Sequence, residues 1–167
     1  MKFAYFSLLL FAPSISLADD IPPISIFGKY ENKHTVYTNC YATEQGASCV
    51  CGNGSFADEN SYCQHEAIDT LLIQRDKAER NAINIEINTA GKDVYACSYD
   101  GSGNWENKAD RAVVNSDIND SDQNCSIALI FKNNLAYVVT KTDNACRQFC
   151  GTRASLDGMI FKKATRH

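Results

Sequence analysis

The sequence has few of the residues on which metal-dependent enzymes rely. It contains three histidines, His34, His65 and the final residue His167. The two histidines in the body of the chain cannot supply the three-histidine ligand set of a catalytic zinc site. His65 and Glu66 begin the H-E-x-x-H motif of zinc proteases, but Asp69 stands where the second histidine is required. We therefore expect no metal centre and no bound cofactor.

Other catalytic motifs are also missing. Ser155 has no G-x-S-x-G surroundings, so it lacks the strand-to-helix elbow that exposes a nucleophilic serine. The acidic stretch 115–124 does not fit a calcium-binding EF-hand loop. Counted from Asp117 or Asp120, the sixth position is not glycine and the twelfth is not glutamate. No catalytic residue is assigned, although carboxylates that converge only in the folded chain would leave a hydrolase open.

A surplus of positive charge is absent as well. The formal net charge is −4 at pH 7, which disfavours binding to nucleic acid or to an anionic membrane surface. The one long apolar run lies in residues 1–18, where Lys2 precedes it and Ser16 and Ala18 fit a cleavage site. We interpret residues 1–18 as a secretory signal peptide. Residues 19–167 are then a single periplasmic or secreted domain without membrane insertion.

What the sequence does have is cysteine. The eight cysteines are Cys40, Cys49, Cys51, Cys63, Cys97, Cys125, Cys146 and Cys150. An even number of cysteines in an exported chain predicts a disulfide framework rather than zinc ligands. Four lie within residues 40–63 and four within 97–150, so we expect two bridges in each group, with Cys49 and Cys51 bonded to different partners. Each bridge would contribute about 2–4 kcal/mol to stability.

Alternating apolar residues predict a series of short β-strands. Strands are expected at 82–88, 94–99, 111–114, 126–131, 135–140 and 159–162, with turns at 90–93, 100–104 and 133–134. Residues 19–26 are expected to be extended, 40–63 to be a cysteine-rich loop segment, and 64–72 to be either a short helix or the start of a strand. The pattern predicts an all-β fold, a small antiparallel barrel or sandwich stapled by disulfides, with its β core at 82–163.

Three residues are candidates for contact with a partner. Arg153 follows the sequence CRQFCG in what we expect to be a structural, disulfide-held loop, and arginine is enriched at binding hot spots. Local pairing of Arg153 with Asp157 or with backbone carbonyls is the structural role, and we favour it over contact with a partner. Trp105 and Tyr99 flank the predicted turn at 100–104 and would line a binding groove, although aromatic residues in strands more often pack in the core.

The C-terminal half resembles a group of small secreted bacterial proteins, mostly uncharacterised. Four elements carry the resemblance: INIEINT at 83–89, VYACSYDG at 94–101, CSIALIF at 125–131 and C-x3-C-G-x-R-A-S-x-x-G at 146–158. In size, export and disulfide-held β structure, the chain is also similar in architecture to periplasmic lysozyme inhibitors.

We therefore expect an exported, non-enzymatic binding protein with a protein partner in the cell envelope. It would be an inhibitor of a cell-wall-active hydrolase, or an immunity protein against one. Two alternatives remain open: a secreted hydrolase that uses carboxylates, and an envelope structural protein without a ligand. The sequence does not fix the oligomeric state.

Overall fold

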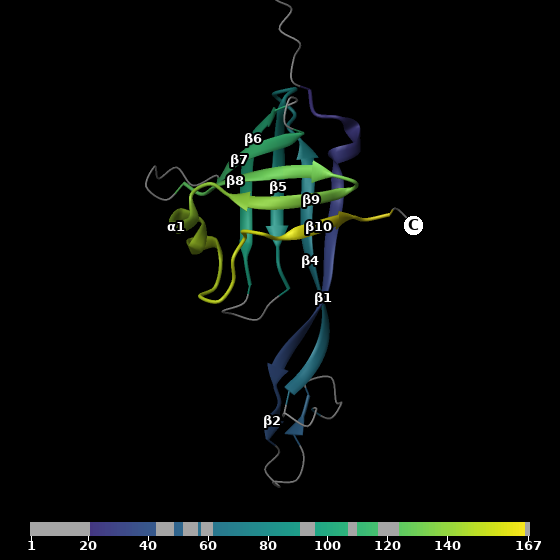
Figure 1. Ribbon diagram of the computed structural model, residues 1–167, viewed down its shortest axis with the longest axis vertical. Coiled ribbons are helices and arrows are strands. Elements are labelled where there is room, and N and C mark those ends of the chain that lie inside the picture. The colour runs from purple at the N-terminus through teal and green to yellow at the C-terminus, as the bar shows by residue number, and fades with distance from the viewer. Residues whose placement is uncertain are drawn as a thin grey trace, which may run out of the picture.

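A computed structural model describes residues 21–42, 49–51, 57, 62–90, 96–106, 110–116 and 124–165. In these ranges, eight antiparallel strands close into a barrel in the order β1-β10-β9-β8-β7-β6-β5-β4 (Figure 1). Their bounds are β1 Gly28–Asn39, β4 Tyr62–Arg75, β5 Ala82–Asn88, β6 Ser98–Glu106, β7 Arg111–Ser116, β8 Ser126–Lys132, β9 Leu135–Thr140 and β10 Ile160–Lys163. The predicted all-β antiparallel class is confirmed, as a barrel. The expected signal peptide lies outside the described residues.

The interior of the barrel is filled by an apolar core. Successive side chains of a strand point to opposite faces, so every second residue faces inward. In β5 these are Ile83, Ile85 and Ile87, which are 0%, 5% and 0% exposed, as the alternation in 82–88 predicts. The other core residues include Tyr30, Leu71, Ile73, Trp105, Val114, Leu129 and Phe161. An eight-stranded barrel is just wide enough for side chains to fill, so its interior is a packed core.

The hairpin formed by β8 and β9 follows the prediction closely. The strands expected at 126–131 and 135–140 are both present. Asn133 and Asn134 between them adopt φ angles of 52° and 63°. A two-residue type I′ turn requires this left-handed conformation at both central positions, and asparagine tolerates it. The turn chemistry therefore fixes the register of the two strands.

The predicted turn at 100–104 is wrong, because β6 runs through it. The two glycines there permit a close approach of β7. A Cβ atom at Gly103 would lie 1.9 Å from the carbonyl oxygen of Val113, and one at Gly101 would lie 2.4 Å from that of Asn115. Glycine in a strand often marks such a close backbone approach rather than a turn. Of the strand expected at 94–99, residues 96–99 are described, and β6 begins at Ser98. The turn expected at 90–93 lies mostly outside the described residues.

The N-terminal half contains more strand than the sequence predicts. At 64–72 the strand alternative is correct, because β4 covers this whole stretch. β1, which was not predicted, pairs with β4 along its full length. Within 40–63, two short strands, β2 at Tyr41–Ala42 and β3 at Cys49–Val50, pair with each other. The rest of that segment lies largely outside the described residues.

One end of the barrel is covered by residues 141–159, which we call the plug. The plug contains α1 at Asp143–Cys146 and the 3-10 helix η5 at Arg147–Phe149. Its Leu156 is 1% exposed and belongs to the barrel core. Near the start of β1, the expected extended entry instead forms the 3-10 helix η1 at Ile24–Ile26. The hydroxyl of Tyr30 donates a hydrogen bond of 3.0 Å to the carbonyl oxygen of Ile26 there.

Candidate functional site

The barrel carries a two-stranded ribbon, which we call the arm and define as residues 32–39 of β1 and 62–69 of β4. β1 and β4 pair in continuous register along the ribbon. The arm lies beyond the barrel wall, because β10 pairs with β1 no further than Glu31 and β5 pairs with β4 no further than Thr70. Beyond these residues the arm projects away from the barrel (Figure 1).

The outer face of the arm exposes large apolar side chains. The pairs Lys33↔Ile68 and Tyr37↔Gln64 lie on the face that continues the outside of the barrel. On this face Tyr37, Tyr62 and Ile68 are 58%, 45% and 42% exposed. Tyr37 and Tyr62 are diagonal neighbours on this face, whereas the exposed pair Thr35↔Glu66 separates Ile68 from them. Neighbouring exposed aromatic side chains mark interaction sites, and tyrosine combines a large ring with a polar hydroxyl. This face is the best candidate for a protein contact surface among the described residues.

The base of the arm is held by a buried carboxylate. Asp69 is 3% exposed and lies on the inner face, next to the end of the apolar core. Its Oδ2 accepts a hydrogen bond of 3.2 Å from Nδ2 of Asn32 and lies 3.3 Å from Nδ1 of His34. Its Oδ1 accepts a hydrogen bond of 2.9 Å from the backbone N–H of Ala90. A buried carboxylate must be paired, so these contacts hold both strands of the arm to the segment after β5.

The carboxylate of Asp69 can also orient the imidazole of His34. A histidine acts as a general base on a nucleophile only when a hydroxyl or thiol lies within hydrogen-bond reach. The cross-strand partner of His34 is Ala67, and its neighbours on the same face of β1 are Asn32 and Val36. None of these three side chains is a nucleophile. The contact with Asp69 therefore positions the arm, and a hydrolytic role for His34 would require water as the nucleophile.

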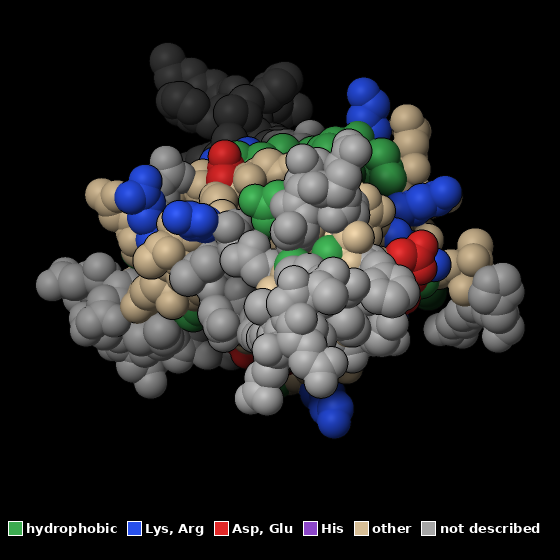
Figure 2. All heavy atoms as spheres, turned by 90° about the horizontal axis from the view of Figure 1, so that it is seen from below, with side chains coloured by type: hydrophobic (Ala, Val, Ile, Leu, Met, Phe, Trp, Pro, Cys, Tyr) green, Lys and Arg blue, Asp and Glu red, His purple; other side chains and the backbone are tan. Residues whose placement is uncertain are grey.

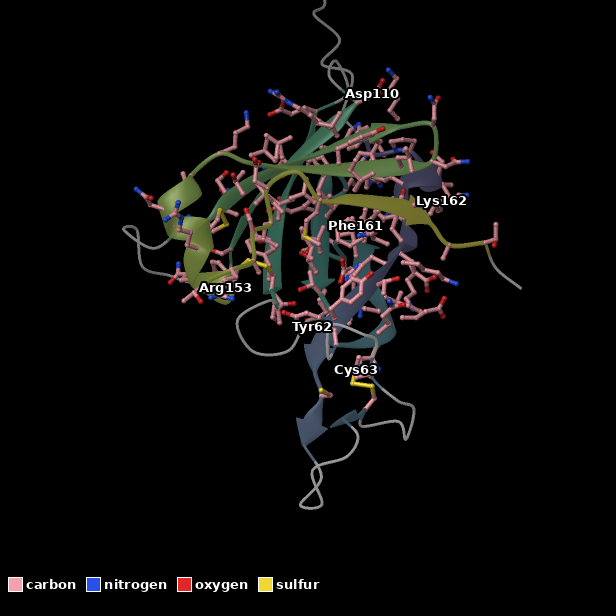
Figure 3. The ribbon with its side chains drawn as sticks, turned by 60° about the horizontal axis from the view of Figure 1, so that its bottom comes forward. Tyr62, Cys63, Asp110, Arg153, Phe161 and Lys162 are labelled. Carbon is pink, nitrogen blue, oxygen red and sulfur yellow. A yellow bond between two sulfur atoms is a disulfide. The ribbon has the colours of Figure 1, made fainter. Side chains whose placement is uncertain are left out.

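The far part of the arm is crosslinked. The disulfide Cys51–Cys63 joins the residue after β3 to the start of β4, and Cys63 lies in the arm in Figure 3. Cys40, directly after β1, is also disulfide-bonded. An isolated two-stranded hairpin is marginally stable in water, so crosslinks of this kind are needed to keep a projecting ribbon in one shape.

Arg153 lies in the plug, at the end of the barrel from which the arm projects (Figure 3). Its side chain is exposed. The disulfides Cys97–Cys150 and Cys125–Cys146 fasten the plug to the barrel. Each cysteine of the C-x3-C motif therefore bonds to a cysteine elsewhere and not to the other. The segment is a structural, disulfide-held loop, and it presents Arg153 on the same side of the molecule as the arm.

The described disulfides agree with the predicted grouping. One bridge lies within 40–63 and two lie within 97–150. Cys51 bonds to Cys63 and not to Cys49, as predicted. No described cysteine is free. The described sulfur atoms are therefore used to crosslink the fold and are not available as thiolate nucleophiles or zinc ligands.

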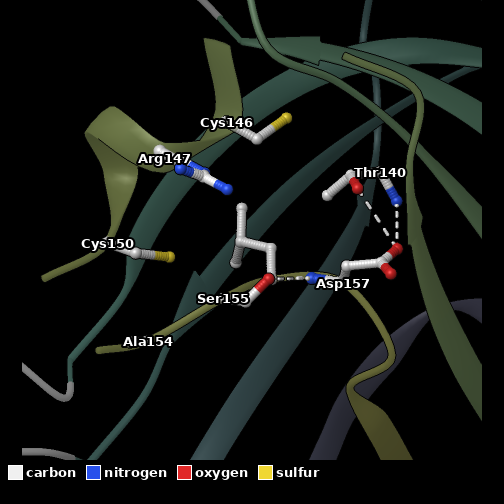
Figure 4. Close-up of a pocket in the computed structure, with 8 residues that line it drawn as sticks. Thr140, Cys146, Arg147, Cys150, Ala154, Ser155 and Asp157 are labelled. Atoms are coloured by element: carbon white, nitrogen blue, oxygen red, sulfur yellow. Dashed lines mark hydrogen bonds between the residues drawn. The ribbon is translucent and has the colours of Figure 1, made fainter. Parts of the chain in front are cut away.

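A pocket of about 170 Å³ lies beside the plug (Figure 4). It is lined by Thr140, Cys146, Arg147, Cys150, Ala154, Ser155, Leu156 and Asp157. Oδ1 of Asp157 accepts hydrogen bonds from the backbone N–H and the hydroxyl of Thr140, at 2.8 and 3.2 Å. The backbone N–H of Asp157 donates to Oγ of Ser155 at 3.1 Å. The pocket is smaller than the roughly 300 Å³ of typical small-molecule sites, and these contacts join the plug to β9.

Trp105 and Tyr99 are core residues, which corrects their assignment as contact residues. They are 3% and 0% exposed, because alternation along β6 points both inward. The indole of Trp105 packs against the ring of Phe131, with 5.6 Å between ring centroids. The hydroxyl of Tyr99 donates to the carbonyl oxygens of Val114 and Cys125, each at 3.2 Å. Both side chains stabilise the barrel from its interior.

Charged side chains are dispersed over the surface that is seen from the arm end. Lys and Arg side chains lie there at several separate places (Figure 2). Nζ of Lys29 lies 2.9 Å from Oε1 of Glu31, and its hydrogen bond and charge lower the pKa of that carboxyl. Burial raises the pKa of Tyr30 to about 12, so its hydroxyl stays neutral.

Within the described ranges, no group of three or more His, Cys, Asp or Glu side chains could hold a metal ion.

No helix in the described part of the chain is long and apolar enough to cross a membrane. No protein-family model, curated protein or solved structure matches the chain. The assignment of a site therefore depends on the geometry of the arm and the plug.

Sequence reasoning missed the arm. The signal in β1 is weak, because its inward positions after Tyr30 are Asn32, His34 and Val36, which do not form an apolar stripe. A half-buried strand is recognised by alternation of apolar and polar residues, and a ribbon that leaves the core does not need that alternation. The β-branched and aromatic residues HTVY at 34–37, directly before Cys40, are the feature that favours a strand there.

Proposed function

We propose that this protein is an exported, non-enzymatic binding protein that inhibits a cell-wall-active hydrolase, with the arm as its contact element. The observation that carries the proposal is the arm itself, a crosslinked ribbon that extends past a filled barrel and exposes Tyr37 and Tyr62. A narrow ribbon suits the substrate cleft of a hydrolase. Arg153, at the same end of the molecule, would contact the rim of that cleft.

The physical support for a binding role is preorganisation. A partner that binds a flexible segment must offset the entropy lost on ordering it, and a crosslinked ribbon lowers that cost. The disulfide Cys51–Cys63 and the contacts of Asp69 hold the arm at its two ends. Two partly exposed tyrosines supply large contact area with few rotatable bonds, which is the composition that binding hot spots favour.

Export is supported by the disulfides, which form and persist in oxidising compartments. The arm would make the same kind of contact in an inhibitor of the cell's own hydrolases and in an immunity protein against a foreign toxin. The two functions differ in whether the bound hydrolase comes from the same cell or from a competitor. The first test is capture from envelope extract with oxidised residues 19–167, followed by an assay of peptidoglycan hydrolysis by the captured enzyme. We expect inhibition at equimolar protein. A captured hydrolase whose activity is unchanged would contradict the proposal.

The second test places the contact on the arm. A variant with Tyr37→Ala and Tyr62→Ala should bind the captured partner at least tenfold more weakly, which corresponds to a loss of about 1.4 kcal/mol or more. The matched control is Ile24→Ala, which truncates an apolar side chain that is 83% exposed in η1, outside the arm. Equal affinity of the two variants would remove the arm from the proposed interface.

The Arg153 contact can be tested separately. Arg153→Ala should weaken binding while the melting temperature stays near that of the wild type, because a contact residue acts only in the complex. A large fall in melting temperature would assign Arg153 to the structure of the plug instead.

A secreted hydrolase is the second candidate, and the buried Asp69 beside His34 is the observation that favours it. In that case the protein alone should degrade peptidoglycan, and Asp69→Asn should abolish the activity while the fold is retained. An envelope structural protein, the third alternative, would show neither hydrolysis nor a partner.

A further inference from the structure

The outer wall of the barrel differs between its two sides. On β5 and β6 the outward residues are polar, and they include the exposed carboxylates of Glu86 and Asp100, which lie opposite each other. On β8, β9 and β10 the outward residues are mostly apolar. The five apolar residues among them that are not buried form what we call the wall patch: Ile130, Leu135, Tyr137, Val139 and Ile160. None of them belongs to the core cluster inside the barrel.

The wall patch is continuous because its members are cross-strand neighbours. Ile130 of β8 pairs with Tyr137 of β9, which pairs with Ile160 of β10. Ile130, Val139 and Ile160 are 38%, 38% and 46% exposed. Contiguous exposed apolar surface of this kind marks an interaction site, whereas single exposed apolar residues do not. Of the two sides compared, only this one has the composition of an interface.

The charges around the wall patch differ at its two ends. Lys132 and Lys162 are exposed at one end, in the row that contains Leu135. Asp157 is exposed at the other end, where its carboxylate contacts Thr140 beside Val139. Glu31, the cross-strand partner of Lys162, is paired with Lys29, and the exposed Lys141 follows Thr140 at the other end. On the strand row of β10 itself, Lys162 lies at one end and Asp157 next to the other.

This distribution is complementary to itself when one copy is reversed. A two-fold axis in the contact plane that crosses the strands at Tyr137 would place Leu135 of one copy over Val139 of the other. Lys162 follows Ile160 by two residues along the chain. Gly158 precedes Ile160 by two residues and is adjacent to Asp157. The same axis would therefore bring Lys162 of one copy close to Asp157 of the other. An axis parallel to the strands would instead oppose lysine to lysine.

We propose that the wall patch is the contact surface between two copies of this chain, related by a two-fold axis that crosses the strands. Isologous pairing of one surface with itself is the commonest way in which soluble proteins assemble. The overall charge of −4 disfavours the competing occupant, an anionic membrane surface. The arm lies outside the contact, so each copy would present its own arm.

The test is the oligomeric state of the oxidised protein, measured by sedimentation velocity from about 1 µM to about 1 mM. A small patch should give a weak dimer, with a dissociation constant on the order of 1–100 µM. Ile160→Glu, which places a carboxylate in the row of Tyr137 at which the axis crosses the strands, should weaken dimerisation at least tenfold. The matched control is Asn104→Glu, which adds the same charge at an exposed position of β6. It should dimerise like the wild type.

A second variant tests the orientation of the two copies. Lys162→Glu should weaken the dimer at low salt, and the difference from the wild type should shrink at high salt, because screening removes the contribution of an exposed ion pair. A wild-type mass that stays monomeric up to about 1 mM would overturn the proposal, and so would equal dimerisation of the Ile160→Glu and Asn104→Glu variants. A monomer that instead sediments with anionic vesicles would assign the wall patch to a membrane surface.

Discussion

Gly103→Ala should destabilise the barrel strongly, because its new methyl group would collide with backbone. The added Cβ atom would lie 1.9 Å from the carbonyl oxygen of Val113 and 2.6 Å from Cα of Val114. Ordinary contact begins at about 3.4 Å, so β7 would have to move by about 1.5 Å (3.4 − 1.9). Backbone held in a sheet cannot rotate away as a flexible side chain can. We expect a cost at or above the upper end of the roughly 1–3 kcal/mol that overpacking typically causes.

The measurement is thermal unfolding of the oxidised protein followed by circular dichroism. For a domain of this size, 1 kcal/mol lowers the melting temperature by about 2–4 °C, so we expect a fall of about 10 °C. The matched control is Gly158→Ala. Gly158 has a φ of 78° but nothing within 4 Å of an added Cβ atom, so it should lose only the 1–2 kcal/mol or so of a left-handed backbone. Equal losses at the two glycines would refute the close approach of β6 and β7.

Three further predictions concern the plug, the base of the arm and the turn at 76–81 between β4 and β5. Leu156→Ala should cost about 2–5 kcal/mol in urea unfolding, because it opens a cavity under the plug, whereas the exposed control Thr152→Ala should cost almost nothing. Asp69→Ala should lower the free energy of unfolding by about 1–3 kcal/mol. It should also speed amide hydrogen exchange in residues 32–39 more than in the barrel strands. Equal acceleration in the arm and the barrel would contradict a local role of Asp69. Backbone hydrogen bonds from Glu79 and Ala78 lower the pKa of Asp76 from its usual 3.8. The ionised carboxylate of Asp76 therefore stabilises the folded state fully above pH 3.8, and this stabilisation is lost as the pH falls through the lowered pKa. Melting temperatures of the wild type should therefore fall more steeply below pH 3.8 than those of Asp76→Asn, and parallel curves would rule this contribution out.

The barrel strands of the C-terminal half could be predicted from sequence because their side chains alternate between core and solvent. Ile83, Ile85 and Ile87 show this alternation directly, and Asn133 and Asn134 identify the turn between β8 and β9. The glycines of β6 misled the prediction, because glycine favours both a turn and a close contact between strands. Only the neighbouring strand decides between the two uses, and that strand comes from elsewhere in the sequence.

The candidate site was less accessible to sequence reasoning. The composition around Trp105 and Tyr99 suggested a contact surface, but the direction in which each side chain points depends on the register of β6, and this register places both inside. The arm escaped prediction because its strands leave the core and so lack an apolar stripe. Arg153 could be located in a disulfide-held loop, yet its position at the arm end follows only from the pairing of the plug cysteines.

The first and last strands of the barrel lie side by side, with Tyr30 opposite Lys163 and Glu31 opposite Lys162. The cylinder can therefore close only after nearly all of the chain has left the ribosome, because β10 has to arrive before β1 has a second neighbour. Contacts between such distant parts of a sequence form slowly. A polypeptide built in this way keeps an open seam beside its first strand until its last strand has been made.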